Sequence, residues 1–123
     1  IAAISSFSSD VRDIWAKAQK GHKKSLYTLE KLAYEIALKI GAYSAALNGL
    51  DAITFTAGIG ENAWYLRRDI CSYLSHLGVK LDSRKNRANS TEIHSPESKV
   101  KVFVIKANEG KQIAREVYNH LKN

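Results

Sequence analysis

Apolar residues recur at helical spacing from Ser25 onward. They fall three or four positions apart, which is the pattern of one face of an α-helix. This stripe comprises Leu26, Leu29, Leu32, Ala33, Ile36, Ala37, Ile40, Tyr43 and Leu47. The pattern predicts a long amphipathic helix that ends near Asn48 and Gly49, with the whole stripe packed in the core.

A shorter helix is predicted before it, over "SSDVRDIWAKAQKG". Ser9 or Asp10 can cap its start, Asp13 lies in the first turn, and Gly21 is a stop signal. A further helix is expected over residues 63–77, followed by Gly78 at a position suited to a left-handed cap. The segment "NEGKQIAREVYNHL" closes the chain as the last predicted helix.

Short β-branched and aromatic runs alternate with these helices. "DAITFT" at 51–56 and "VKVFVIK" at 100–106 are typical of buried strands, and "VKLD" at 79–82 predicts a brief one. Residues 83–99 show no apolar rhythm and contain the single proline, so we expect a surface excursion there. Strands that alternate with helices predict an α/β fold with helices packed on a sheet.

The stretch "TFTAGIGENA" places two glycines between the strand at 51–56 and the next helix. Gly58 and Gly60 lack a Cβ, so the backbone there can approach a ligand closely and adopt positive φ. Ligands of open α/β sheets bind beyond the carboxyl ends of the strands, and a helix N-terminus favours phosphate. The spacing alone leaves two interpretations open, a phosphate or nucleotide loop and a structural tight turn.

Composition narrows the class of protein. The 123 residues carry a net charge of +7 and contain one cysteine, Cys71. No apolar run is long enough to span a membrane, and no signal peptide is visible, so a cytoplasmic setting is the simplest interpretation. The basic residues are spread along the chain, which favours a solvated face over a nucleic-acid site. A phosphate ligand would also suit such a charge.

Several quoted segments together resemble the C-terminal part of the acetate kinase family. They are "SSDVRDI", "IGAYSAALNGLDAITFTAGIGEN", "LGVKLD" and "VFVIKANE…IARE". The resemblance covers nearly the whole chain. It implies that residues 1–123 are part of the C-terminal actin-like ATPase (ribonuclease H-like) domain of the acetate and sugar kinase, Hsc70 and actin superfamily, with the N-terminal domain absent.

The resemblance also implies an activity, the magnesium-dependent and reversible transfer of a phosphoryl group from ATP to acetate, giving acetyl phosphate and ADP. It places the family's nucleotide-binding residues at Asp10, Val11, Arg12, Gly58, Ile59, Gly60, Glu61 and Asn62. It places the acidic residue of the magnesium site at Glu109, followed by Gly110 where the family has a second glutamate.

Each assignment has a structural alternative. Asp10 can cap the first helix, Arg12 can pair with a surface aspartate such as Asp13, and Glu109 can favour the N-terminus of the last helix through its dipole. Other chemistry-bearing residues are expected to be structural. His22, His76, His94 and His120 share no metal-ligand spacing and are expected to be surface or helix-flank residues. Cys71 has no obvious base and is expected to be a half-buried structural thiol. Trp15 and Trp64 are expected to pack, although Trp64 could also shield a ligand edge.

The family's acyl-binding and catalytic residues lie upstream of this sequence. We therefore expect the isolated 123 residues to be inactive and the parent protein to be a homodimeric kinase. Alternatives are a propionate or butyrate kinase, a non-catalytic nucleotide-binding module, and a basic nucleic-acid-binding domain.

Overall fold

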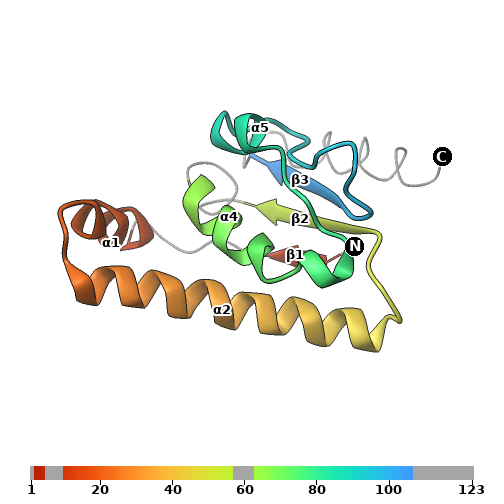
Figure 1. Cartoon of the computed structure of the whole chain (residues 1–123), viewed down its shortest axis with the longest axis horizontal. Helices are drawn as coiled ribbons and strands as arrows, with labels where there is room; N and C mark the ends of the chain where they lie inside the picture. Colours follow the sequence, from red (N-terminus) through yellow and green to blue (C-terminus); the bar gives the residue numbers. More distant parts are fainter. Residues whose placement is uncertain (1, 5–9, 57–62, 107–123) are drawn as a thin grey trace.

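The computed structural model describes residues 2–4, 10–56 and 63–106. In this part of the chain, three parallel strands form one sheet in the order β1-β2-β3. The strands are β1 (Ala2–Ile4), β2 (Ala52–Thr56) and β3 (Lys101–Ile105). In Figure 1, α4 lies in front of the sheet, α2 runs along the bottom of the view on the side of β1, and α5 lies at the top near β3. The α/β class and the two longer strands are confirmed.

Two helices connect β1 to β2. They are α1 (Asp10–Gln19) and α2 (Lys23–Ala46), joined at Gly21, whose φ is +88°. His22 caps α2, since its Nδ1 accepts a hydrogen bond from the backbone N–H of Ser25 at 3.2 Å. Beyond α2, Asn48 and Gly49 adopt positive φ and end the helix as predicted.

The apolar stripe of α2 is buried only along its middle. Leu29, Ala33, Ile36, Ala37 and Ile40 are buried, whereas Leu26, Tyr43 and Leu47 are 47%, 53% and 61% exposed. The prediction that the whole stripe lies in the core is therefore wrong at both ends. The 24 residues of α2 extend about 36 Å, whereas a five-residue strand spans about 17 Å, so the helix overhangs the sheet.

The helix expected over 63–77 is two elements. Helix α4 (Trp64–Ser72) is followed by the 3₁₀ turn η1 (Ser75–Leu77). The N–H groups of Tyr73 and Leu74 bond to carbonyls three residues back, which tightens the chain and ends the α-helix. Gly78 takes the predicted left-handed cap with φ +90°.

Residues 79–100 differ from the prediction. The stretch 79–82 is not a strand, because it makes a single isolated bridge, between Leu81 and His94. The expected surface excursion contains helix α5 (Ser83–Arg87), capped by Asp82, whose Oδ1 accepts from the N–H of Lys85 at 3.0 Å. It also buries Ile93 completely, so this segment contributes to the core.

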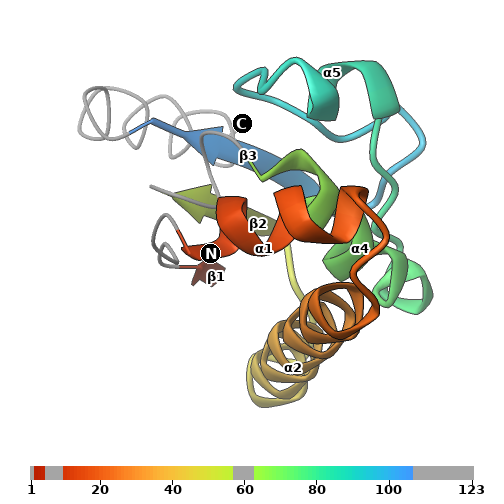
Figure 2. The same ribbon diagram turned by 90° about the vertical axis from the view of Figure 1, so that its left-hand side faces the viewer.

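The two faces of the sheet follow the alternation of each strand. Ile53 and Phe55 of β2 join Val102 and Val104 of β3 in the main core with α1, α2 and α4. The opposite face holds a smaller cluster of Ala52, Phe103 and Ile105. Figure 2 shows α1 and α4 on one side of the sheet.

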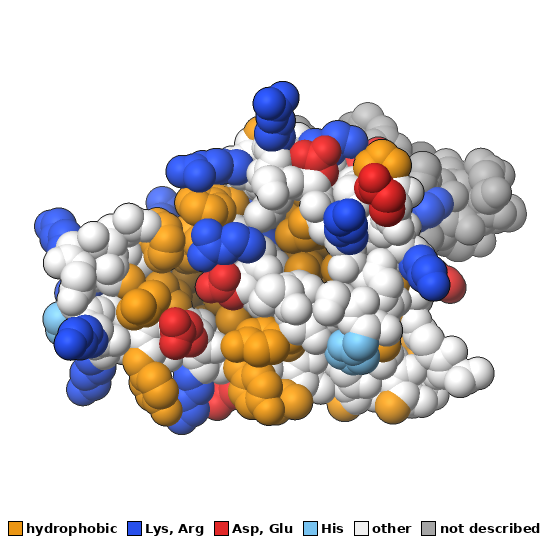
Figure 3. All heavy atoms as spheres, in the orientation of Figure 1, with side chains coloured by type: hydrophobic (Ala, Val, Ile, Leu, Met, Phe, Trp, Pro, Cys, Tyr) orange, Lys and Arg blue, Asp and Glu red, His pale blue; other side chains and the backbone are white. Residues whose placement is uncertain are grey.

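Charge is dispersed over the visible surface. On the face in Figure 3, Lys and Arg side chains are scattered among Asp and Glu rather than gathered in one patch. Within the part of the chain that the structure describes, no helix is both long and apolar enough to cross a membrane.

Candidate functional site

The carboxyl ends of the three strands lie at one edge of the sheet. In the parallel register, Ile4 is opposite Phe55, and Thr56 is opposite Ile105. The chain leaves this edge into segments 5–12, 57–62 and 106–110, which contain all the site residues inferred from the resemblance. This is the edge at which open α/β sheets bind ligands. Gly58, Ile59, Gly60, Glu61, Asn62 and Glu109 lie outside the described residues.

The first candidate segment opens helix α1. Asp10 is the first residue of the helix, Val11 is 6% exposed and belongs to the main core, and Arg12 is exposed. The side chain of Val11 is thus a packing group, so contact with a ligand there would have to come from its backbone. Arg12 remains available to a ligand through its side chain.

Arg12 lies close to the start of helix α4. Burial raises the pKa of the Tyr65 hydroxyl, while the positive charges of Arg12 and Arg67 lower it by a smaller amount. Because water and salt largely screen charges that are more than about 10 Å apart, this effect indicates that Arg12 lies in the surroundings of Tyr65. The structure therefore brings one predicted site residue next to the helix that follows the glycine turn.

Aromatic contacts hold these two helices together. Trp15 of α1 stacks on Tyr65 of α4 with ring centroids 4.0 Å apart and planes 6° from parallel. Trp15 also meets the edge of Trp64 at 5.8 Å. The expected packing role of both tryptophans is confirmed, and the stack fixes the middle of α1 against the start of α4.

The beginning of α4 is poorly capped by its own residues. Ala63, at the N-cap position, makes no side-chain capping bond, and the first turn of α4 contains no acidic residue. The N–H groups of Leu66 and Arg67 both donate to the carbonyl of Ala63, at 3.0 and 3.1 Å. The positive end of the helix dipole thus lies at Ala63 and Trp64, where an anion would be favoured.

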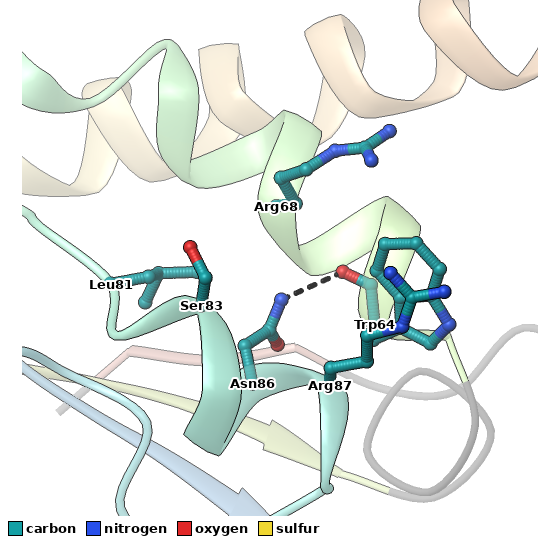
Figure 4. A pocket seen from close by; sticks show the side chains of 6 residues that line it. All are labelled: Trp64, Arg68, Leu81, Ser83, Asn86 and Arg87. Carbon is teal, nitrogen blue, oxygen red and sulfur yellow. Dashed lines mark hydrogen bonds between the residues drawn. The ribbon is translucent and has the colours of Figure 1, made fainter.

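A buried hydrogen-bond cluster joins α4 to α5. The Arg67 side chain is fully buried. Its Nε donates to Asn86 Oδ1 at 2.7 Å, and its Nη2 donates to the Asn86 carbonyl at 2.7 Å and to Asn89 Oδ1 at 2.6 Å. Asn86 Nδ2 in turn donates to the carbonyl of Trp64 at 2.9 Å (Figure 4). Burial lowers the pKa of Arg67 to about 10, which still leaves the guanidinium charged at neutral pH.

Sequence reasoning missed this cluster because it counted Arg67 among solvated basic residues. A signal was present, since Arg67, Ile70 and Leu74 recur at helical spacing and are all buried. An arginine in phase with apolar residues indicates a buried guanidinium with polar partners. No comparable signal marks Asn86.

A pocket of about 240 Å³ lies between α4 and the segment around α5. Figure 4 shows its lining residues, which are Trp64, Arg68, Leu81, Ser83, Asn86 and Arg87. The guanidinium carbons of Arg87 and Arg68 lie 4.3 and 5.2 Å from the centre of the Trp64 ring. Sites for drug-sized ligands and cofactors occupy roughly 300–1,000 Å³, so this pocket is too small to hold a whole nucleotide.

Two of the remaining titratable candidates, His94 and Cys71, are structural. His94 Nδ1 accepts from the N–H of Val102 at 3.0 Å. Cys71 is 5% exposed, and burial raises the pKa of its thiol to about 12, which suppresses the reactive thiolate. His76 is exposed, and His120 lies outside the described residues. Among the described residues, no group of three or more His, Cys, Asp or Glu could hold a metal ion.

A sequence model of the Acetokinase family matches residues 1–115. The chain belongs to the acetokinase family. It is 53% identical over 114 residues to the acetate kinase of Thermotoga maritima, covering 89% of this chain and 28% of that protein. It is 47% identical over 117 residues to the acetate kinase of Carboxydothermus hydrogenoformans, covering 94% and 29%. This acetokinase chain thus spans under a third of the length of these relatives.

Solved structures agree with this family and fold. An acetate kinase from Porphyromonas gingivalis matches with a TM-score of 0.74 and 34% identity, over 91% of this chain and 29% of that one. A propionate kinase from Francisella tularensis matches with a TM-score of 0.74 and 37% identity, over 86% and 27%. The acetokinase resemblance and the α/β kinase fold expected from the sequence are confirmed.

Proposed function

We propose that the protein carrying this chain is an acetate kinase, which reversibly transfers the γ-phosphoryl group of ATP to acetate and forms acetyl phosphate and ADP. The observation that carries this proposal is the family match over residues 1–115, together with 53% and 47% identity to proteins named acetate kinase. Because the chain covers 28% and 29% of these relatives, the reaction is proposed for the whole protein, and the isolated 123 residues are expected to be inactive.

The role proposed for this chain is to hold the nucleotide at the carboxyl edge of the sheet. Asp10, Val11 and Arg12 would line one side, and the loop from Gly58 to Asn62 the other. Two observations support this arrangement. Arg12 is close enough to Tyr65 to affect its pKa, and the Trp15–Tyr65 stack joins α1 to α4. Phosphoryl transfer depends largely on positioning and on stabilising negative charge, so a rigid cradle contributes directly to the rate.

Magnesium is proposed as the metal that accompanies ATP and ADP. It would neutralise phosphate charge in the reaction. Glu109 is proposed as the acidic residue nearest to it, because a carboxylate oxygen suits Mg²⁺. A homodimeric assembly and a cytoplasmic setting are likewise proposed from the family. No role in binding nucleic acid or a membrane is proposed.

Propionate is the second candidate substrate. The propionate kinase structure from Francisella tularensis is as similar in fold as the acetate kinase from Porphyromonas gingivalis, each with a TM-score of 0.74. Fold similarity over this segment therefore does not separate the two substrates.

The test uses the full natural protein, purified and supplied with ATP, Mg²⁺ and either acetate, propionate or butyrate. Acyl phosphate is trapped with hydroxylamine and measured as the hydroxamate, and ADP is measured independently. We expect acetyl phosphate and ADP in equal amounts, and loss of both when Mg²⁺ is chelated. A higher kcat/KM for propionate would assign the second candidate. The absence of acyl phosphate with all three carboxylates would refute the kinase proposal.

A further inference from the structure

The buried cluster of Arg67 and Asn86 joins α4 to α5 but carries a large desolvation penalty. Their side chains are 0% and 3% exposed. Removing a guanidinium from water is costly, and apolar residues of similar volume often give equal or greater stability at such positions. The cluster is therefore better explained by what it holds in place than by a gain in stability.

The geometry of the Asn86 amide shows what is held. Its Oδ1 accepts from Arg67 Nε at 2.7 Å, so its Nδ2 must point the other way, where it donates to the Trp64 carbonyl at 2.9 Å. Arg67 thus fixes the orientation of the amide, and the amide ties α5 to the first residue of α4. Figure 4 shows this bond reaching the Trp64 carbonyl at the start of α4.

We propose that Asn86 is a positioning residue that holds the first turn of α4 in the geometry needed to bind the nucleotide. This inference rests on the proposed function, because it takes the loop from Gly58 to Asn62 as the nucleotide cradle. Asn86 acts through the Trp64 backbone and does not itself contact the nucleotide.

The first turn of α4 needs such support. Ala63 supplies no capping side chain, and the nine residues of α4 are too few to form a stable helix alone. Displacement of a binding group by about 1 Å can lower activity by about 100-fold, so fraying of this first turn would weaken a nucleotide site next to it.

The experiment compares Asn86→Asp with Asn89→Asp in the full natural protein. Each substitution keeps an oxygen that can accept from Arg67 and adds one negative charge beside the same guanidinium. Asn86→Asp loses the donor to Trp64, whereas Asn89→Asp leaves that bond intact. Asn89 has φ +55°, a conformation that aspartate also tolerates, so the control is not strained by its backbone.

We expect Asn86→Asp to raise the Kd and the KM for ATP by about three- to tenfold, the effect of one hydrogen bond. The kcat at saturating ATP should change little, and Asn89→Asp should bind ATP like the unsubstituted protein. Equal ATP affinity in the two variants would overturn the positioning role. If the unsubstituted protein binds no ATP, the proposed function itself is wrong and this role falls with it.

Hydrogen exchange supplies a second measurement that does not depend on ligand. The amides of Leu66 and Arg67 bond to the Ala63 carbonyl and report on the first turn of α4. They should exchange faster in Asn86→Asp than in Asn89→Asp. The same exchange rates in both variants would show that the bond to Trp64 does not hold this turn.

Discussion

Replacing Gly78 by alanine should destabilise the protein for two separable reasons. The first is backbone strain, because Gly78 has φ +90°, where an L-residue pays about 1–2 kcal/mol. The second is a clash, because a Cβ at this position would lie 2.7 Å from Lys99 Cβ. Carbon atoms normally meet at about 3.5–4.0 Å, and overpacking of this kind costs about 1–3 kcal/mol.

The segment around Lys99 cannot easily move away from the added methyl group. The N–H of Lys99 donates to the Gly78 carbonyl at 2.8 Å, and the hydroxyl of Ser98 donates to the same carbonyl at 3.3 Å. Val79 and Val100, which follow Gly78 and Lys99, are both buried. We therefore expect a total loss of about 2–5 kcal/mol in the free energy of unfolding of Gly78→Ala.

Gly21→Ala is the matched control. Gly21 has φ +88°, but a Cβ there would meet no atom within 4 Å, so it should suffer the strain without the clash. Urea-induced unfolding of the full natural protein measures both variants. In a double-mutant cycle, adding Lys99→Gly should remove the extra destabilisation of Gly78→Ala over Gly21→Ala. Adding Lys99→Ala should not remove it, because alanine keeps the Cβ that causes the clash. Equal destabilisation at both glycines would refute the clash.

Three further predictions concern the candidate site and the core. Gly58→Ala and Gly60→Ala should weaken ATP binding by about tenfold, because a methyl group would obstruct the cradle; calorimetry measures this affinity. The control is Gly41→Ala, which should bind ATP normally because a Cβ there would meet open space. If the two loop variants lose stability but the folded fraction binds ATP normally, the turn is only structural. Glu109→Gln should raise the magnesium requirement of the full natural protein and leave its melting temperature nearly unchanged, and the reverse result would make Glu109 a structural residue. Cys71 should react with iodoacetamide at pH 8 far more slowly in the native than in the urea-unfolded protein, because burial raises the pKa of its thiol to about 12. Peptide mass spectrometry follows the reaction, and equal rates in the two states would contradict this burial.

The raised pKa of the Cys71 thiol also predicts how the free energy of unfolding changes with pH. Its pKa is about 12 in the folded chain, compared with an ordinary value of 9.0. As the pH rises above about 9, the unfolded chain loses this proton first, so the contribution of Cys71 to stability should fall between about pH 9 and 12. The fall should be smaller in a Cys71→Ala variant.

Local pattern was sufficient to predict most of the described elements. The β-branched runs correctly predicted β2 and β3, and the helical spacing of apolar residues correctly predicted α2. Both patterns reflect which side chains the fold buries. The same rhythm could not show where the burial stops. Leu26 and Leu47 continue the stripe in sequence, but the helix extends beyond the sheet at these positions. The length of the sheet is set by its strands and cannot be read from the sequence of the helix.

The site was predicted unevenly for a similar reason. Arg12 and the glycine loop could be named because the resemblance covers contiguous segments. Asn86 could not, because its importance depends on a bond to Trp64, 22 residues earlier in the chain. Such a contact exists only after α5 has packed beside α4, so no local pattern records it.

The parallel sheet has a consequence for how the chain reaches its native state. Ala52 pairs with Lys101, 49 positions later, and Ala2 pairs with Ile53, 51 positions later. Each pairing must close a loop of about 50 residues before its hydrogen bonds form, which is entropically costly and slows folding. On the ribosome, α1 and α2 can associate early, while the N–H and C=O groups on one edge of β2 stay unpaired until β3 is available. Until β3 has been synthesised and can pair with it, this edge of β2 can pair with another chain, which favours aggregation.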